Sequence, residues 1–332
     1  MQATENQKSH SGWKRWTWVP KLALTLVALG FVLKSVDVAQ LREMVTRQDH
    51  SMIIAVAALG LLQMWLGSVR WQIILCKLAK APRALPSHRR IATVYYISMF
   101  FNTCLPGTVG GDVVRVWLAK GEGVPMSLAI HSIVIDRMIT LFGLLIMVFI
   151  VLPYVCQRAG TDPWMIMGPL ALLPIVGGAF LLGMHRMPRR FCESKIGGWA
   201  LQLAGSVRQV FMNPLTCLMA TTLVILGHST FCMMAYLLAQ SLNIDLTLVE
   251  ALMYIPIVML VTVLPISIGG WGVREAGMVA LLGLSGIPAG SAVVLSVQLA
   301  LVIIMIGLPG GILWLLRRSS ARAEASLKDN RS

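Results

Sequence analysis

Long apolar runs separated by short polar segments dominate the chain. A helix that crosses the hydrocarbon core of a bilayer needs about 20 apolar residues. Segments that reach or approach this length are expected to be membrane-spanning helices, and they are Trp18–Val36, Met52–Cys76, Met126–Leu152, Trp164–Met184, Pro214–Ser241 and Gly290–Leu316. The pattern therefore predicts an all-α, polytopic membrane protein.

Two further apolar regions, 91–118 and 248–284, carry proline and paired glycines in the middle. Each half has about 11 to 18 residues, which is marginal for a crossing and suits half a helix. Proline and glycine pairs also disfavour an unbroken helix. We expect each region to be a re-entrant hairpin, which enters the membrane and returns to the same side.

The two interruptions repeat one another. The run L-P-G-T-V-G-G-D-V-V-R begins at Leu105, and L-P-I-S-I-G-G-W-G-V-R begins at Leu264. This internal repeat predicts two units, 51–152 and 214–316, each arranged as span, hairpin and span. Three predicted crossings separate the starts of the units, and an odd number reverses orientation. We therefore expect inverted-topology repeats around a midplane site, plus two additional spans.

Composition and charge agree with a membrane protein: 57% of the residues are hydrophobic, 13% are charged, and the mean hydropathy is +0.75. The formal charge of +14 comes from short basic clusters beside apolar segments. This placement favours anionic lipid headgroups and an orientation with basic loops inside, not nucleic-acid binding. With the N-terminus inside, most Lys and Arg residues fall in cytoplasmic segments, so both termini are predicted to be cytoplasmic.

The other segments complete the predicted organisation. Residues 1–50 hold an N-terminal tail and the first helix, 153–213 a connecting helix and a basic cytoplasmic linker, and 317–332 a disordered basic tail. The six scattered cysteines form no metal or disulfide pattern, and no cofactor is expected. Walker, H-E-x-x-H and G-x-S-x-G motifs are absent from the sequence.

Ionisable residues inside apolar segments are functional candidates by default. Asp112 and Arg115 are three positions apart and can share a helix face. Asp136 and Arg137 lie about ten residues into the next predicted span, and we expect Asp136 to pair with Arg115 or Arg137 with Asp112. A purely structural ion-pair network is the alternative. Arg70, near the cytoplasmic end of its span, is expected to snorkel to the interface.

The second copy carries Arg274 and Glu275, and Trp271 stands where the first copy has Asp112. Glycine pairs free backbone N–H groups, and the N-terminus of a half-helix carries a partial positive charge. Each interruption followed by arginine is therefore a candidate phosphate receptor. The predicted substrate-binding residues are Asn102, Gly107, Gly110, Gly111, Asp112, Arg115, Asp136, Arg137, Ser267, Gly269, Gly270, Gly272, Arg274 and Glu275.

These motifs resemble the transmembrane region of lysylphosphatidylglycerol synthases, over about Pro20–Leu316. The resemblance rests on Asn102, Pro106, Gly110, Gly111, Asp112, Arg115, Asp136, Arg137, Pro265, Ser267, Gly269, Gly270, Gly272, Arg274 and Glu275. It implies a bacterial or archaeal multi-pass protein of the cytoplasmic (inner) membrane that moves a charged lipid between leaflets. Bifunctional relatives add a soluble aminoacyl-transferase domain. Because this chain ends soon after its last predicted span, we expect that enzymatic half and lipid aminoacylation to be absent.

The function expected from the sequence is a flippase, not an enzyme, that moves a charged phospholipid or glycolipid between leaflets through a cavity between the two inverted re-entrant hairpins. Arg115 and Arg274 are expected to hold the headgroup phosphate, while Asp112, Asp136 and Glu275 balance charge or bind a basic group. Two alternatives stay open: a transferase acting on a polyprenyl-phosphate-linked lipid, with Asp112 or Asp136 as base, and a non-catalytic partner of a separate lipid-modifying enzyme. The expected ligands are membrane lipids with anionic or zwitterionic headgroups. The oligomeric state is left open.

Overall fold

The computed structural model describes residues 51–104, 110–183, 195–263 and 270–329. Within these ranges the elements are helices, and no strand is present. In chain order they are α4 (Ser51–Leu78), the 3-10 turn η1 (Pro82–Ala84), α5 (His88–Cys104), α6 (Gly110–Gly121), α7 (Met126–Ala159), α8 (Pro163–Gly183), α10 (Lys195–Phe211), α11 (Pro214–Ser241), α12 (Leu248–Val263), α13 (Val273–Gly283) and α14 (Ala289–Asp329).

The prediction of an all-α membrane protein is confirmed for the described part of the chain. Helices α4, α7, α11 and α14 are long and apolar enough to cross a membrane. Helix α8 forms within its predicted segment, and its apolar part, Pro163–Ala179, is shorter. The first expected span, Trp18–Val36, lies outside the described residues.

Each interrupted apolar region forms two short helices. Helix α5 ends at Cys104 and α6 begins at Gly110, while α12 ends at Val263 and α13 begins at Val273. Each pair flanks a proline, which cannot donate a backbone hydrogen bond and disfavours helix in the residue before it. The segments 105–109 and 264–269 lie outside the described residues. The candidates Gly107, Ser267 and Gly269 lie in these segments.

The order of helices repeats along the chain. A long helix, two short helices and another long helix occur as α4, α5, α6 and α7, and again as α11, α12, α13 and α14. Cys104 and Val263, which end the first short helix of each set, are 159 positions apart, as are Arg115 and Arg274. The same element order at one constant offset supports the internal repeat that the sequence predicted.

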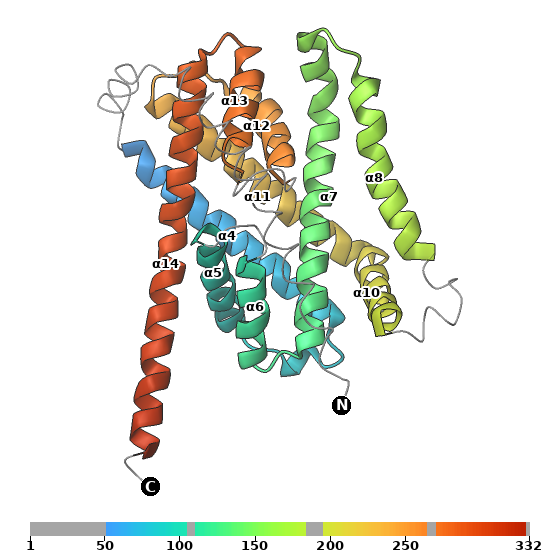
Figure 1. Cartoon of the computed structure of the whole chain (residues 1–332), viewed down its shortest axis with the longest axis vertical. Coiled ribbons are helices and arrows are strands. Elements are labelled where there is room, and N and C mark those ends of the chain that lie inside the picture. The colour runs from blue at the N-terminus through green and yellow to red at the C-terminus, as the bar shows by residue number, and fades with distance from the viewer. Residues whose placement is uncertain (1–50, 105–109, 184–194, 264–269, 330–332) are drawn as a thin grey trace, which may run out of the picture.

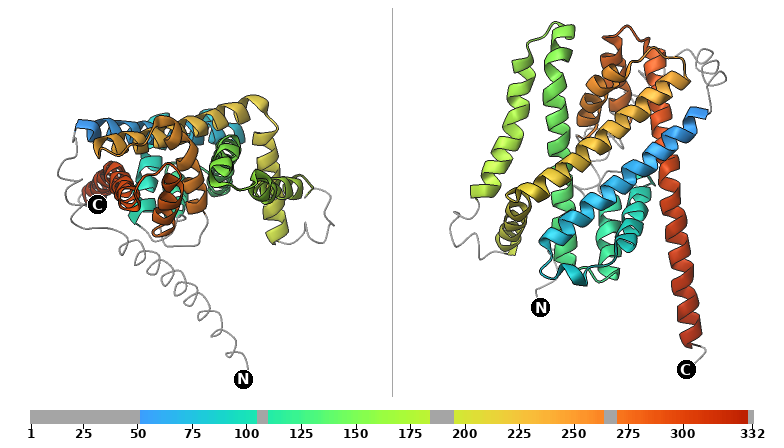
Figure 2. Two further views of the ribbon diagram at one scale, coloured as in Figure 1. Left: turned by 90° about the horizontal axis from the view of Figure 1, so that it is seen from above. Right: turned by 180° about the vertical axis from the view of Figure 1, so that it is seen from behind.

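The two short pairs lie at opposite ends of the molecule. In Figure 1 the pair α5 and α6 occupies the lower half and the pair α12 and α13 the upper half. Helices α4 and α11 pack side by side and run diagonally across the back, as the rear view in Figure 2 shows. Helix α7 packs on α12, and α14 packs on α5, so the closing long helix of each unit contacts the short pair of the other unit.

Apolar packing fills each unit and also joins the two units, since one cluster places Ile74 and Ile135 of the first unit with Val224 of the second. The first cluster of buried side chains centres on α11 to α14 and includes Leu238, Tyr254 and Leu295. A second cluster, with Trp71 and Leu118, joins α4, α5, α6 and the start of α7. Large apolar side chains on α8, such as Trp164, are instead exposed, as lipid-facing residues of a membrane protein are.

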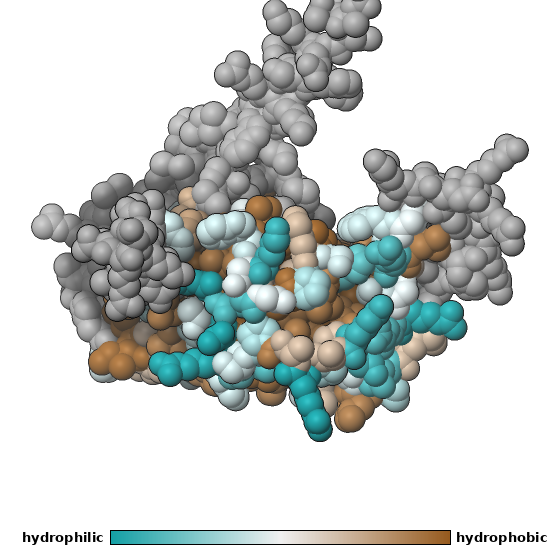
Figure 3. All heavy atoms as spheres, turned by 90° about the horizontal axis from the view of Figure 1, so that it is seen from below, coloured by the Kyte–Doolittle hydropathy of each residue, from teal (hydrophilic) through white to brown (hydrophobic). Residues whose placement is uncertain are grey.

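Hydrophilic side chains gather at the lower end of the molecule (Figure 3). The connection from α4 to α5 contributes the exposed Arg83, and the start of α5 contributes the exposed Arg89 and Arg90. Basic residues of this segment were among those from which the cytoplasmic side of the protein was predicted.

The tail expected to be disordered from residue 317 is helical in the structure, because α14 continues to Asp329. The segment from Ala321 to Ala325 alternates alanine with arginine and glutamate, which are strong helix formers.

Helix α6 lies unusually close to α5 at Gly111. A Cβ atom at this position would lie 2.1 Å from the backbone oxygen of Ser98 and 2.5 Å from the Asn102 side chain. The Gly111 N–H donates to Oδ1 of Asn102 over 3.0 Å. The second glycine of the first G-G pair thus permits contact between the two arms of the short pair.

We expect Gly111→Ala to destabilise the protein by about 1–3 kcal/mol, because the added methyl group must displace backbone. The midpoint of thermal unfolding in detergent should fall accordingly. Gly205→Ala in α10 is the matched control, since its Cβ would meet nothing within 4 Å. Equal midpoints for the two variants would contradict the close approach of α5 and α6.

Candidate functional site

Asp136 lies at the centre of a buried charge network formed by α4, α6 and α7. Only 2% of the Asp136 surface is exposed. Oδ1 accepts a hydrogen bond from Nε of Arg70 over 2.7 Å, and Oδ2 accepts one from Nη1 of Arg115 over 3.1 Å. The predicted pair Asp136 and Arg115 is therefore confirmed.

The expectation that Arg70 snorkels to the interface is wrong. Arg70 is 8% exposed and bridges α4 to Asp136 on α7. It turns inward because a buried carboxylate supplies the charge partner that an isolated arginine in an apolar span would otherwise seek at the interface.

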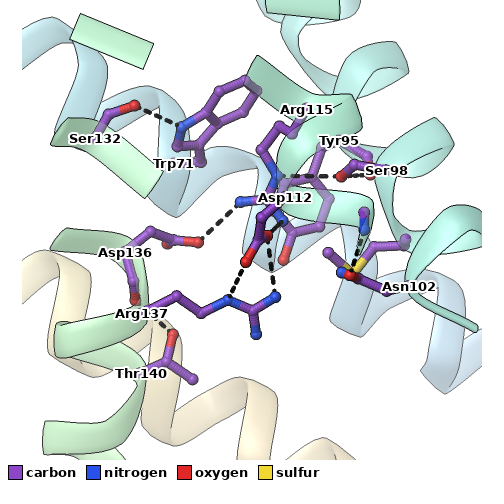
Figure 4. A network of polar contacts seen from close by, with 12 residues as sticks. Trp71, Tyr95, Ser98, Asn102, Asp112, Arg115, Ser132, Asp136, Arg137 and Thr140 are labelled. Atoms are coloured by element: carbon purple, nitrogen blue, oxygen red, sulfur yellow. Dashed lines mark hydrogen bonds and ion pairs between the residues drawn. The ribbon is translucent and has the colours of Figure 1, made fainter. Parts of the chain in front are cut away.

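Arg115 is enclosed by polar and aromatic side chains from α4 and α5 (Figure 4). Its Nε donates to Oγ of Ser98 over 3.1 Å. Its guanidinium carbon lies 4.5 Å from the ring centre of Tyr95 and 5.3 Å from that of Trp71. Aromatic faces attract a cation at these distances. With 1% of its surface exposed, Arg115 is a fixed internal charge.

Arg137 and Asp112 form the second predicted pair, which is also confirmed. Arg137 donates from Nε to Oδ2 of Asp112 over 2.9 Å and from Nη2 to Oδ1 over 3.0 Å. Asp112 Oδ1 also lies 3.6 Å from Nη2 of Arg115. The Arg137 side chain is 45% exposed, against 14% for Asp112. Asp112 thus links a buried arginine to an accessible one.

The second copy holds its arginine differently. Glu275 is fully buried and accepts from Nη2 of Arg274 over 2.7 Å. Ser296 on α14 contacts both side chains, at 3.0 Å from Glu275 Oε1 and 2.9 Å from Arg274 Nε. The indole ring of Trp271 lies 4.9 Å from the Arg274 guanidinium carbon.

A backbone turn prepares this arrangement. Gly270 and Gly272 have φ of 79° and 82°, in the left-handed region that favours glycine. The Gly272 N–H donates to Oε2 of Glu275 over 2.6 Å at the start of α13. The glycines of the second copy therefore orient the carboxylate that holds Arg274.

A cavity of about 1110 Å³ lies between the two units. Its walls come from α6, α7, α11, α12, α13 and α14, and most of the side chains that line it are apolar. The charged groups at its surface belong to Asp112, Lys120, Arg137 and Arg274. Thr140, His228 and Thr262 contribute uncharged polar side chains to the lining.

The structure divides the predicted site residues by position. Asp112, Arg137, Gly270 and Arg274 line the cavity. The other described candidates do not line it and instead support the residues that do; they are Asn102, Gly110, Gly111, Arg115, Asp136, Gly272 and Glu275. The phosphate-binding role expected for Arg115 therefore does not fit this cavity.

Sequence reasoning missed Arg70 as part of the network and Lys120, Thr140 and Thr262 as cavity residues. Ser296 was also missed as a partner of Arg274. The sequence could have indicated it, because Ser296 lies 159 positions after Arg137, the same offset that relates Arg274 to Arg115. In the described residues, no group of three His, Cys, Asp or Glu side chains is placed to hold a metal ion.

The sequence model of one protein family, the lysylphosphatidylglycerol synthase TM region, matches residues 18–312 of the chain. The chain belongs to this family. Searches among curated proteins and among solved structures found no significant match. Membership in the lysylphosphatidylglycerol synthase TM family associates the protein with membrane lipids and supports its multi-pass placement.

Asp136→Asn should destabilise this family member by about 3–5 kcal/mol, because Arg70 and Arg115 would lose their buried counter-charge. Thermal unfolding in detergent measures the effect. Asp245→Asn, in an exposed position between α11 and α12, is the control and should leave the midpoint unchanged. An Asp136→Asn protein as stable as the control would show that the network contributes little to stability.

Proposed function

We propose that the protein translocates a lipid with an anionic headgroup between membrane leaflets without changing its covalent structure. The observation that carries this proposal is the large apolar cavity between two repeated units, in which positive charges exceed negative ones. Apolar walls suit acyl chains, and cationic groups suit a headgroup phosphate.

The charge excess of the cavity favours an anionic headgroup. Lys120, Arg137 and Arg274 carry positive charge, and Asp112 alone among the lining residues carries negative charge, which leaves a formal charge of +2. The undescribed segments 105–109 and 264–269 contain no ionisable residue. Charges in a low-dielectric environment are costly unless they are compensated. Asp112 and Glu275 pair with Arg137 and Arg274, and a bound phosphate would compensate the positive charge that remains.

Arg137 and Arg274 are the proposed headgroup ligands. Arginine binds phosphate through paired N–H groups, and both side chains reach the cavity surface. Arg115, Asp136 and Glu275 have a supporting role in this proposal. They hold α6 and α13 in place and balance the charge of the arginines.

The proposal treats the two units as inverted repeats with cytoplasmic termini. Helices α5 and α6 lie in one half of the molecule and α12 and α13 in the other (Figure 1). Short broken helices that meet near the midplane are the arrangement by which many secondary transporters expose one site to either side in turn.

The geometry favours translocation over the transferase alternative. Asp112 is bound at both carboxylate oxygens by Arg137, and Asp136 is bound by two arginines. Because these carboxylate oxygens already accept hydrogen bonds from arginine N–H groups, a substrate hydroxyl would have to displace an arginine to reach them. Neither is therefore well suited to act as the general base that a transferase needs.

Leaflet exchange of labelled lipids in proteoliposomes tests the proposal. Lys120 lines the cavity and is exposed, so reversing its charge should leave folding intact. We expect Lys120→Glu to slow exchange of labelled phosphatidylglycerol by about tenfold through loss of electrostatic attraction. Exchange of labelled phosphatidylcholine, whose headgroup is zwitterionic, should change less.

Arg83→Glu is the matched control, because Arg83 is exposed and does not line the cavity. The proposal fails if the wild-type protein does not accelerate exchange of any lipid. The assignment to anionic lipids fails if Lys120→Glu and Arg83→Glu exchange phosphatidylglycerol equally fast.

A further inference from the structure

We propose that Arg158 and Arg317 are a matched pair of latches that control access to the cavity from opposite ends of the molecule. This inference rests on the proposed lipid translocation, and it adds the residues that would select which side is open. The upper latch is Arg158 with Glu250, Tyr254 and Ser285. The lower latch is Arg317 with Glu122.

The upper latch joins the end of α7 to the opposite unit. Nη1 of Arg158 lies 3.5 Å from Oε1 of Glu250 on α12. The same nitrogen donates to Oη of Tyr254 over 3.1 Å and to Oγ of Ser285 over 3.2 Å. Ser285 follows α13, so this one arginine contacts both arms of the second short pair.

The lower latch joins α14 to the first short pair. Nη2 of Arg317 lies 2.8 Å from Oε1 of Glu122, which follows α6. Arg90 on α5 lies 3.7 Å from the other oxygen of the same carboxylate. Glu122 therefore receives positive charge from α14 and from the neighbouring arm of its own short pair.

The repeat relates the two latches. Arg158 and Arg317 are 159 positions apart, the same offset that relates Arg115 to Arg274. Each extends from the closing long helix of one unit to the short pair of the other. In Figure 1 these short pairs occupy the upper and lower halves of the molecule. Two equivalent arginines thus fasten opposite ends of one structure.

Their exposure suits groups that separate and re-form. The arginine side chains are 50% and 35% exposed, whereas the glutamates are 15% and 14% exposed. Ion pairs in such positions are weak, so a single pair can shift a conformational equilibrium without determining the fold. This contrasts with the Asp136 network, whose members are buried.

The latches act on helices that line the cavity. Helices α6 and α7 contribute lining residues from the first unit, and α12, α13 and α14 from the second. Releasing Arg158 frees α12 and α13 from the end of α7, which opens the upper end. Releasing Arg317 frees α6 from α14, which opens the lower end. Breaking one latch favours access from its own side.

Side-specific labelling of a cavity cysteine tests this inference. Thr262 lines the cavity one residue before the end of α12, and its replacement by cysteine changes little volume. The full-length protein with Thr262→Cys and its six native cysteines replaced would be labelled with a membrane-impermeant maleimide. Right-side-out and inverted vesicles give the labelling rate from each side.

Arg158→Gln should raise labelling about threefold from the side of Glu250 and lower it from the side of Glu122, and Arg317→Gln should do the opposite. Arg83→Gln is the matched control and should change neither rate. Arg317→Lys keeps the positive charge opposite Glu122 and should retain the wild-type ratio. Equal changes from both sides, or none in either latch variant, would overturn the latches.

The labelling readout does not require lipid transport, so the two proposals can fail separately. A wild-type protein that exchanges lipid but whose latch variants label like Arg83→Gln would refute the latches alone. Side-dependent labelling in a protein that exchanges no lipid would support alternating access and refute lipid translocation.

Discussion

The structure of the first unit depends on one carboxylate. Asp136 accepts hydrogen bonds from Arg70 and Arg115, and all three side chains are buried among apolar helices. Removing one partner from such a group leaves an uncompensated buried charge, which is far more costly than losing a surface ion pair. The network therefore fixes α4, α6 and α7 relative to one another. It also fixes Asp112 and Arg137, which neighbour Arg115 and Asp136 in space and in sequence.

The second unit meets the same constraint with a different carboxylate. Leu295 stands at the position equivalent to Asp136, and Glu275 binds Arg274 from the same helix. Ser296, equivalent to Arg137, contacts both. Because an arginine is missing at that position, a carboxylate in place of Trp271 would lack the partner that Asp112 has. The indole ring instead covers Arg274, whose side chain remains 15% exposed at the cavity surface.

Sequence reasoning succeeded where a single stretch of chain carries the information. The length of apolar runs predicted the long helices, the interruptions at Pro106 and Pro265 marked the short pairs, and the need to pair intramembrane charges predicted the partners of Asp112 and Asp136. It failed at Arg70, because hydropathy gives the depth of a residue but not the helix it faces. A cavity between the hairpins was predicted, but its full lining was not predictable, since its walls come from six helices far apart in sequence.

The position of Asp112 suggests how the site can exchange partners without exposing an unbalanced charge. Asp112 lies between the exposed Arg137 and the buried Arg115. Under the proposed function, a headgroup phosphate that draws Arg137 away from Asp112 leaves Asp112 beside Arg115, which still compensates its charge. Without Arg115, the same movement would strand a carboxylate in a low-dielectric environment. The buried arginine thus lowers the cost of moving the accessible one, although it never reaches the cavity itself.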